Sequence, residues 1–243
     1  RVRWSGIEFV GDAGDATFTI GDNGLQGVFD GVDTRADRVD RPIADGEFDA
    51  PGYLTGVLGS ISGSIITATD SAYEHALRRL TGIPARGTSR MVVSSSGWGT
   101  VWLGARRSGK PDVKHLVWGR HAQFQVQFFA PDPRKYGPVR SFHGASVQAF
   151  HYGNFAAVPA VEVVGPVSAP YTVASQGHQV TVTQALTAGQ KHRIDMSTGW
   201  VYRDGVLQTG VTSAVDVFTI PPGEAVTVSG PPSMTVHVAD TFV

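Results

Sequence analysis

Two groups of residues have the types and spacing that hydrolases use. Residues 59–63 (Gly-Ser-Ile-Ser-Gly) match the Gly-x-Ser-x-Gly pattern of a nucleophile elbow, in which Ser60 would be the nucleophile. Glu47 and Asp49 could act as the paired carboxylates of a glycosidase. An elbow needs a sharp turn from a strand directly into a helix, however, and the first helical pattern begins only near residue 71. The two carboxylates lie in an arginine-rich segment, where solvated ion pairs are the commoner role. We therefore predict that the chain is not an enzyme, and a hydrolase stays an alternative.

The eight histidines could indicate a metal or catalytic site, but their spacing does not. His75 is the only histidine within the predicted helix, so the chain has no His-Glu-x-x-His pair. The lack of cysteine excludes disulfides and thiolate ligands, and the glycine loop of phosphate-binding proteins does not occur. We expect no catalytic residue, no metal and no cofactor.

Two aromatic residues are the best candidates for binding a ligand. Trp200 and Tyr202 are two positions apart on a predicted strand, so their side chains share one face of it. Exposed aromatic rings on a β-sandwich can stack against a sugar. The alternative is that Trp200 fills the core of the sandwich.

Composition restricts the class of protein. The 243 residues are 41% hydrophobic, which is typical of a globular chain with room for one large domain or two of ordinary size. The net charge of -1 argues against nucleic acid as the main partner, because such partners require a basic surface. No apolar run approaches the roughly 20 residues of a membrane span, so we expect no membrane insertion. The chain begins with Arg1 rather than methionine, from which we expect a processed or missing first segment.

Charge is segregated along the chain. Residues 1–50 contain 11 acidic and 5 basic residues, whereas residues 51–141 contain 4 acidic and 12 basic residues. Residues 142–243 contain 6 acidic and 3 basic residues. An acidic segment is therefore followed directly by a basic one.

The first part of the chain predicts strands and one helix. Apolar residues recur at helical spacing over residues 71–81, with Asp70 or Ser71 as the N-cap and Gly82 as the end. Residues 122–130 alternate phenylalanine or valine with glutamine, as a half-buried strand does. Residues 30–52 lack any period and predict a long loop.

The second part predicts a β-sandwich. Residues 139–152 are expected to be an extended connector, and a domain boundary is expected at 152–153. Short Val- and Thr-rich strands follow at regular spacing, including one at residues 215–220. Asp204-Gly205 is the strongest hairpin signal in the chain, because both residues tolerate the positive φ of a type I′ turn.

Three stretches resemble the distal tail proteins of long-tailed phages (siphophages), which are tail-tip or minor tail proteins. Residues 122–137 (AQFQVQFFAPDPRKYG) resemble the end of their ring domain, residues 154–165 (NFAAVPAVEVVG) the entry into their second domain, and residues 192–205 its central hairpin. The resemblance follows the order of elements over nearly the whole chain. It implies a mainly β fold: an N-terminal, split β-barrel-like ring domain with one helix (1–152), then a C-terminal galectin-like β-sandwich (153–243).

The resemblance also implies a function. The chain would be a structural virion protein of the tail tip, assembled in the host cytoplasm into a homo-oligomeric ring, expected to be a hexamer. The ring would join the tail tube protein to the tip hub and leave a channel for DNA. Tape measure and receptor-binding proteins would be further partners. The alternative function is a carbohydrate-binding sandwich that recognises host cell-wall glycans.

A ring would give the charge segregation a role. A closed cyclic assembly brings one patch of a subunit against a different patch of its neighbour. The acidic surface of residues 1–50 could then meet a basic surface that includes Arg106, Arg107 and Lys110, which we predict as subunit-interface residues. The alternative is that these charges pair within one subunit.

Overall fold

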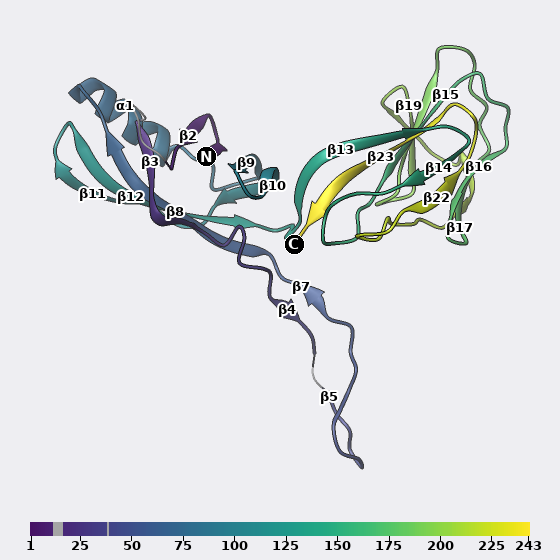
Figure 1. Cartoon of the computed structure of the whole chain (residues 1–243), viewed down its shortest axis with the longest axis horizontal. Helices are drawn as coiled ribbons and strands as arrows, with labels where there is room; N and C mark the ends of the chain where they lie inside the picture. Colours follow the sequence, from purple (N-terminus) through teal and green to yellow (C-terminus); the bar gives the residue numbers. More distant parts are fainter. Residues whose placement is uncertain (12–16, 38) are drawn as a thin grey trace. The chain divides into compact units, whose positions relative to one another are not determined.

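The structure is a computed structural model that describes residues 1–11, 17–37 and 39–243. The chain forms two compact units, Arg1–Lys135 with Val243, and Tyr136–Phe242. Both units are built from antiparallel strands, and the described residues contain one helix (Figure 1). The mainly β prediction with a single helix is thus confirmed. The units divide at Lys135, ahead of the expected boundary at 152–153, because residues 136–152 pair with strands of the second unit.

The first unit has two sheets that share one strand. The first sheet has the order β2-β1-β9-β10, and the second the order β11-β12-β8-β3. Strand β10 pairs with β9 over residues 99–105, and its last two residues, Arg106 and Arg107, pair with β12. The strands are β1 (Val2–Trp4), β2 (Ile7–Phe9), β3 (Phe18–Gln26), β8 (Val57–Ile66), β9 (Ser89–Ser95), β10 (Gly99–Arg107), β11 (Asp112–Val117) and β12 (His121–Ala130).

The core of the first unit follows from strand alternation. Phe124, Val126 and Phe128 of β12 are buried, and the intervening glutamines are exposed, as predicted. The Phe9 ring lies 5.5 Å from the Phe18 ring and 5.6 Å from the Phe124 ring, so aromatic contacts join the two sheets. Burying each such side chain contributes about 1.5–3 kcal/mol, which makes this cluster a main source of the unit's stability.

The central strand β8 lies between β3 and β12 and depends on two glycines. A Cβ atom at Gly63 would collide with the backbone of Thr19 on β3. A Cβ atom at Gly59 would collide with Phe128 on β12 and with the backbone of Gln26. Both neighbours therefore approach β8 closely only because these positions have no side chain.

The predicted helix is present as α1 (Asp70–Thr81), and it buries Tyr73, Ala76 and Leu80. The predicted N-cap is wrong. Thr69 has extended backbone angles and its hydroxyl oxygen accepts from the backbone nitrogen of Ala72 at 3.2 Å, which satisfies one free amide of the first turn. Asp70 instead forms an ion pair with Arg120 at 2.8 Å.

Residues 34–37 and 39–54 form an arm that extends away from the rest of the first unit (Figure 1). The predicted loop is therefore partly ordered as two short ladders, in which β4 (Thr34–Arg35) pairs with β7 (Tyr53–Leu54) and β5 (Val39–Asp40) with β6 (Glu47–Phe48). Gly46 turns the chain with a φ of 92°. The sequence did not predict these ladders, because the arm has no buried face and therefore no alternation of apolar and polar residues.

The second unit consists of two sheets that face each other across an apolar core. One has the order β13-β23-β15-β18-β19-β20 and the other the order β14-β22-β16-β17-β21. The expected connector at 139–152 is mostly strand, since it supplies β13 and β14 to these sheets. The strands are β13 (Lys135–His143), β14 (Ser146–Ala149), β15 (Ala160–Val164), β16 (Tyr171–Ser175), β17 (His178–Val182), β18 (Lys191–Asp195), β19 (Trp200–Arg203), β20 (Val206–Gln208), β21 (Thr212–Val215), β22 (Val226–Ser229) and β23 (Met234–Phe242).

The strongest turn signal was correct, and one strand prediction was wrong. Asp204 and Gly205 both have positive φ, 50° and 86°, and join β19 to β20 as a two-residue hairpin.

The strand expected at 215–220 ends at Val215. The residues beyond it supply buried Phe218 and Ile220 to the core without forming a ladder, so apolar content alone suggested a strand.

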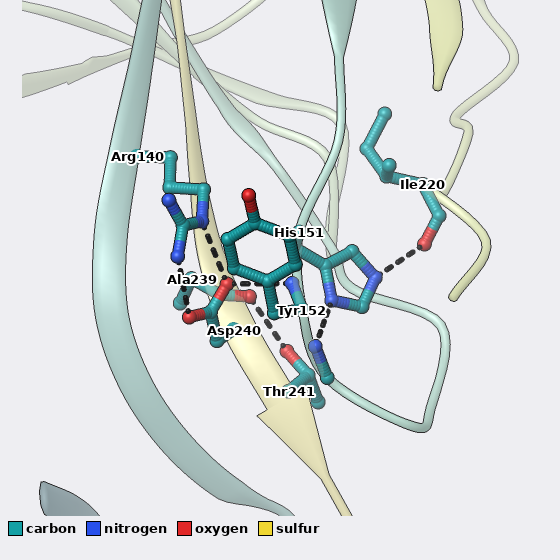
Figure 2. A network of polar contacts seen from close by, with 8 residues as sticks. Arg140, His151, Tyr152, Ile220, Ala239, Asp240 and Thr241 are labelled. Carbon is teal, nitrogen blue, oxygen red and sulfur yellow. Dashed lines mark hydrogen bonds and ion pairs between the residues drawn. The ribbon is translucent and has the colours of Figure 1, made fainter. Parts of the chain in front are cut away.

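A polar network fastens the segment after β14 to β23 (Figure 2). The Asp240 carboxylate accepts from Arg140 Nε at 3.0 Å, from Arg140 Nη2 at 3.2 Å and from the Tyr152 backbone nitrogen at 2.8 Å. The Arg140 guanidinium also lies 4.0 Å from the Tyr152 ring centroid, a cation–π distance. Buried His151 donates to the Ile220 carbonyl and accepts from the Gly153 nitrogen, which requires its neutral tautomer.

Candidate functional surfaces

Ser60 does not lie in a nucleophile elbow. It occupies the middle of β8, opposite Gln127 on one side and Gln26 on the other, and is 8% exposed. In the described part of the chain, no histidine forms a hydrogen bond with it. A serine flanked by two paired strands has neither the turn nor the base that nucleophilic catalysis requires.

Glu47 and Asp49 lie on the exposed arm. The cavity described on the arm is lined by other residues, Tyr53 among them, and provides no enclosed space for a scissile bond between the two carboxylates. Asp49 forms no ion pair with any described residue, and Arg41 lies 5.8 Å over the Phe48 ring instead. The geometry therefore offers no support for the hydrolase alternative.

Residues 1–11, 17–37 and 39–243 contain no group of three His, Asp or Glu side chains arranged to hold a metal ion. Two buried histidines are instead part of the packing. His192 Nδ1 is 2.7 Å from the Tyr171 hydroxyl and its Nε2 is 3.1 Å from Gln184 Oε1, while His151 belongs to the network of Figure 2. Within the same residues, no helix has the length and apolar character of a membrane span.

The three predicted interface residues lie at the end of β10 and just after it. The Arg106 guanidinium is 4.9 Å from the Phe129 ring centroid, and Arg107 Nε is buried without a hydrogen-bond partner. Lys110 is exposed in the following turn. None of the three forms an ion pair with a carboxylate of the described residues. No carboxylate of residues 1–11, 17–37 or 39–243 therefore neutralises these charges by an ion pair.

The arm carries the opposite charge and exposed apolar side chains. Asp40, Asp45 and Asp49 form no ion pair with a described residue. Ile43 at the tip is 99% exposed, and Phe48 and Tyr53 are more than half exposed. Such a concentration of apolar side chains on a thin projection is typical of a surface that another protein covers. Residues 12–16 and 38, which belong to the predicted acidic segment, lie outside the described residues.

A polar cavity of about 730 Å³ lies at the base of the arm, and Asp30 and Asp33 are among its lining residues. Lys135 is almost completely buried, and its Nζ donates to the Val28 carbonyl at 2.8 Å. Burial lowers the pKa of Lys135, and the Asp30 carboxylate partly opposes that shift. This lysine therefore serves the fold and adds no free charge to the basic surface.

Trp200 and Tyr202 share the outer face of the sheet, as predicted. Trp200 is 52% exposed, so the alternative that it fills the core is wrong; Val201 between the two aromatics is buried instead. Tyr202 lines a cavity of about 420 Å³ together with charged residues of β15 and β18. The sequence analysis missed Lys191, Arg193 and Asp195, although they alternate with buried His192 and Ile194 along β18.

The fold is similar to that of solved phage proteins. The crystal structure of the SPP1 Dit protein matches with a TM-score of 0.74 at 12% identity, over 92% of this chain and 93% of that chain. The chain has the fold of the SPP1 Dit protein. A chain of the phage P2 baseplate in its activated, Ca-containing conformation matches with a TM-score of 0.52 at 6% identity, over 90% of this chain and 89% of that chain.

No protein-family model and no curated protein sequence matches this chain. The Dit fold is thus shared with almost no sequence identity. The resemblance to distal tail proteins was based on the order of elements along the chain. The structural match confirms that resemblance.

Proposed function

We propose that this chain is a structural, non-enzymatic protein of the tail tip of a long-tailed phage. The match with SPP1 Dit over 92% of the chain supports this function. That protein is described as a paradigm of the hub adsorption apparatus of phages that infect Gram-positive bacteria. The chain would be part of the virion and would contact the tail tube protein, the tip hub, the tape measure protein and receptor-binding proteins.

Within this function, the first unit would be a split β-barrel-like ring-forming domain, and the second unit a galectin-like sandwich. Six copies would enclose a channel for DNA. The chain itself would make no specific contact with nucleic acid, in keeping with its net charge of -1.

Unpaired charge of both signs on the first unit supports assembly through opposite patches. Among the residues that the structure describes, no ion pair joins the acidic arm to the basic surface around Arg106 and Lys110. A head-to-tail ring would place the arm of each subunit on the basic surface of the next. Complementary charge would fix the register of that contact, and the exposed apolar side chains of the arm would supply most of its buried area.

The mass and shape of the purified chain test the ring. Native mass spectrometry should show a species of six times the 25.8 kDa chain mass, and negative-stain electron microscopy should show an annulus. Where the chain alone stays monomeric, mixing with the tube and hub proteins of the same phage should produce the annulus. A monomer under both conditions would contradict the proposal.

A charge exchange tests the arm contact. Arg106→Glu with Lys110→Glu should weaken assembly, most strongly at low salt, and Asp45→Lys with Asp49→Lys should do the same. Combining the four substitutions should restore assembly. Arg107 is left unchanged because its Nε is buried. Arg78→Glu with Glu74→Lys, which reverses an exposed ion pair within α1, is the matched control. Equal assembly of all variants at every salt concentration would refute the electrostatic contact.

A further inference from the structure

The second unit presents a row of polar and aromatic side chains on the outer face of its larger sheet. Glu162 of β15 lies opposite Arg193 of β18, and Arg193 lies opposite Tyr202 of β19. On the next rung, Asp195 lies opposite Trp200. Val161, Ile194 and Val201 alternate with these residues and belong to the core, so the row faces away from it.

The row borders a hollow. A cavity of about 420 Å³ is lined by Glu162, Lys191, Arg193, Asp195 and Tyr202, and by the Asp204-Gly205 turn at one end. That volume lies within the roughly 300–1,000 Å³ typical of small-molecule sites. Trp200 is not one of the lining residues, but it lies opposite Asp195, which is, and 52% of its surface is exposed.

All three carboxylates that line the hollow are held in place by the protein. Glu162 Oε2 is 3.0 Å from Lys191 Nζ, and Asp204 Oδ1 accepts from the Lys191 backbone nitrogen at 3.1 Å. Asp195 Oδ1 accepts from both the backbone nitrogen and the hydroxyl of Ser197. Each of these carboxylates keeps a second oxygen that can accept from a ligand.

Arg193 has no such partner. Its guanidinium forms no hydrogen bond or ion pair with any of the described residues, although the Glu162 carboxylate lies opposite it on β15. Its five N–H donors are therefore available to a ligand in the hollow that Arg193 lines.

The combination selects one ligand class. A saccharide has hydroxyls that both donate and accept, and a face of C–H groups that stacks on an aromatic ring. The hollow contains three carboxylates against two cations, a balance that disfavours phosphate-bearing polyanions. We propose that the outer face of β15, β18 and β19 binds a neutral saccharide. Trp200 and Tyr202 stack on the sugar ring, Arg193 donates to its oxygens, and Asp195 and Glu162 accept from its hydroxyls.

The site gives the second unit a function that ring assembly does not require. Binding would depend on the second unit alone, whereas the proposed ring contacts lie on the first. Failure of one proposal therefore leaves the other standing.

A glycan array probed with the full chain tests the site. The array carries neutral oligosaccharides of hexoses, deoxyhexoses and N-acetylhexosamines, with phosphate-bearing glycans beside them. Binding is expected to a neutral class, and isothermal titration with that oligosaccharide gives the affinity. Trp200→Ala and Arg193→Met should each weaken binding about tenfold, equivalent to about 1.4 kcal/mol. Trp118→Ala is the control, because Trp118 is an even more exposed tryptophan on the first unit.

Thermal unfolding of each variant confirms that the second unit stays folded, and native mass spectrometry confirms that assembly is unchanged. Absence of binding to every neutral class would overturn the proposal. Binding that survives both Trp200→Ala and Arg193→Met would overturn it as well. A preference for phosphate-bearing glycans would replace the saccharide with an anionic ligand.

Discussion

The Asp240 network offers the sharpest test of how the second unit is held together. Asp240→Asn keeps the volume of the side chain but removes its charge and turns an amide group toward the Arg140 donors. The Asp240 side chain is 6% exposed and that of Arg140 is 30% exposed. Breaking a buried ion pair by removing one partner costs about 3–5 kcal/mol. Because Arg140 can still reach water, we expect Asp240→Asn to lower the free energy of unfolding by about 2–3 kcal/mol.

The same exposures predict an asymmetry. Arg140→Met leaves a carboxylate that is almost completely buried without its cation, so it should cost more than Asp240→Asn, about 3–5 kcal/mol. The hydrogen bond with the Asp240 carboxylate also raises the pKa of Arg140, which indicates that Asp240 stabilises the charged form of Arg140. The double variant should show a coupling energy of about 2 kcal/mol.

Hydrogen exchange of the full chain in increasing urea, followed by mass spectrometry of peptides from β15, β18 and β23, reports on the second unit alone. The control is Asp216→Asn, which removes a carboxylate from an exposed pair with His178 and should cost less than about 1 kcal/mol. A coupling energy below about 0.5 kcal/mol, or equal effects of Asp240→Asn and its control, would refute the reasoning.

Three further substitutions have definite expected outcomes. Gly153→Ala places a Cβ 2.5 Å from the Thr241 backbone nitrogen, so the segment must shift, and differential scanning calorimetry should show a loss of about 1–3 kcal/mol in the second unit. Burial and the neighbouring Arg203 lower the pKa of His192 below its ordinary value of 6.5. As the pH falls through 6.5 toward the lower folded-state pKa, the unfolded chain gains a proton that the folded chain does not, so stability present above 6.5 is lost. His192→Gln should flatten the dependence of the melting temperature on pH between 7 and about 5, and an unchanged slope would contradict this assignment. Thr69→Ala removes the N-cap of α1 and should lower the urea midpoint of the first unit by the equivalent of about 1 kcal/mol, whereas Ser71→Ala should have little effect.

The sequence predicted elements well where local chemistry decides the structure. The alternation in β12, the apolar face of α1 and the Asp204-Gly205 hairpin each depend on residues that are neighbours in the chain. The arm and β13 were missed for the opposite reason. The arm has no buried face, and β13 takes its partner, β23, from the other end of the sequence.

The candidate surfaces were predicted only in part. Trp200 and Tyr202 were identified from their spacing, since i and i+2 share a face of any strand. Arg193 was not identified. It is a candidate ligand-binding residue because it lies opposite Tyr202 and has no partner, and neither property can be read without the register between β18 and β19. In the same way, the sequence showed that charge was segregated, but only the structure showed that Arg106 and Asp45 form no ion pairs with described residues of their own subunit.

The two glycines of β8 have a consequence for how this fold can diverge. Where Gly59 and Gly63 lie, the neighbouring backbones occupy the space that any other amino acid would need, so these two positions are closed to substitution. Most of the buried side chains are apolar, and their positions need only an apolar side chain of suitable volume, which several amino acids can supply. Two chains can therefore differ at most positions and keep the same fold, as this chain and SPP1 Dit do at 12% identity.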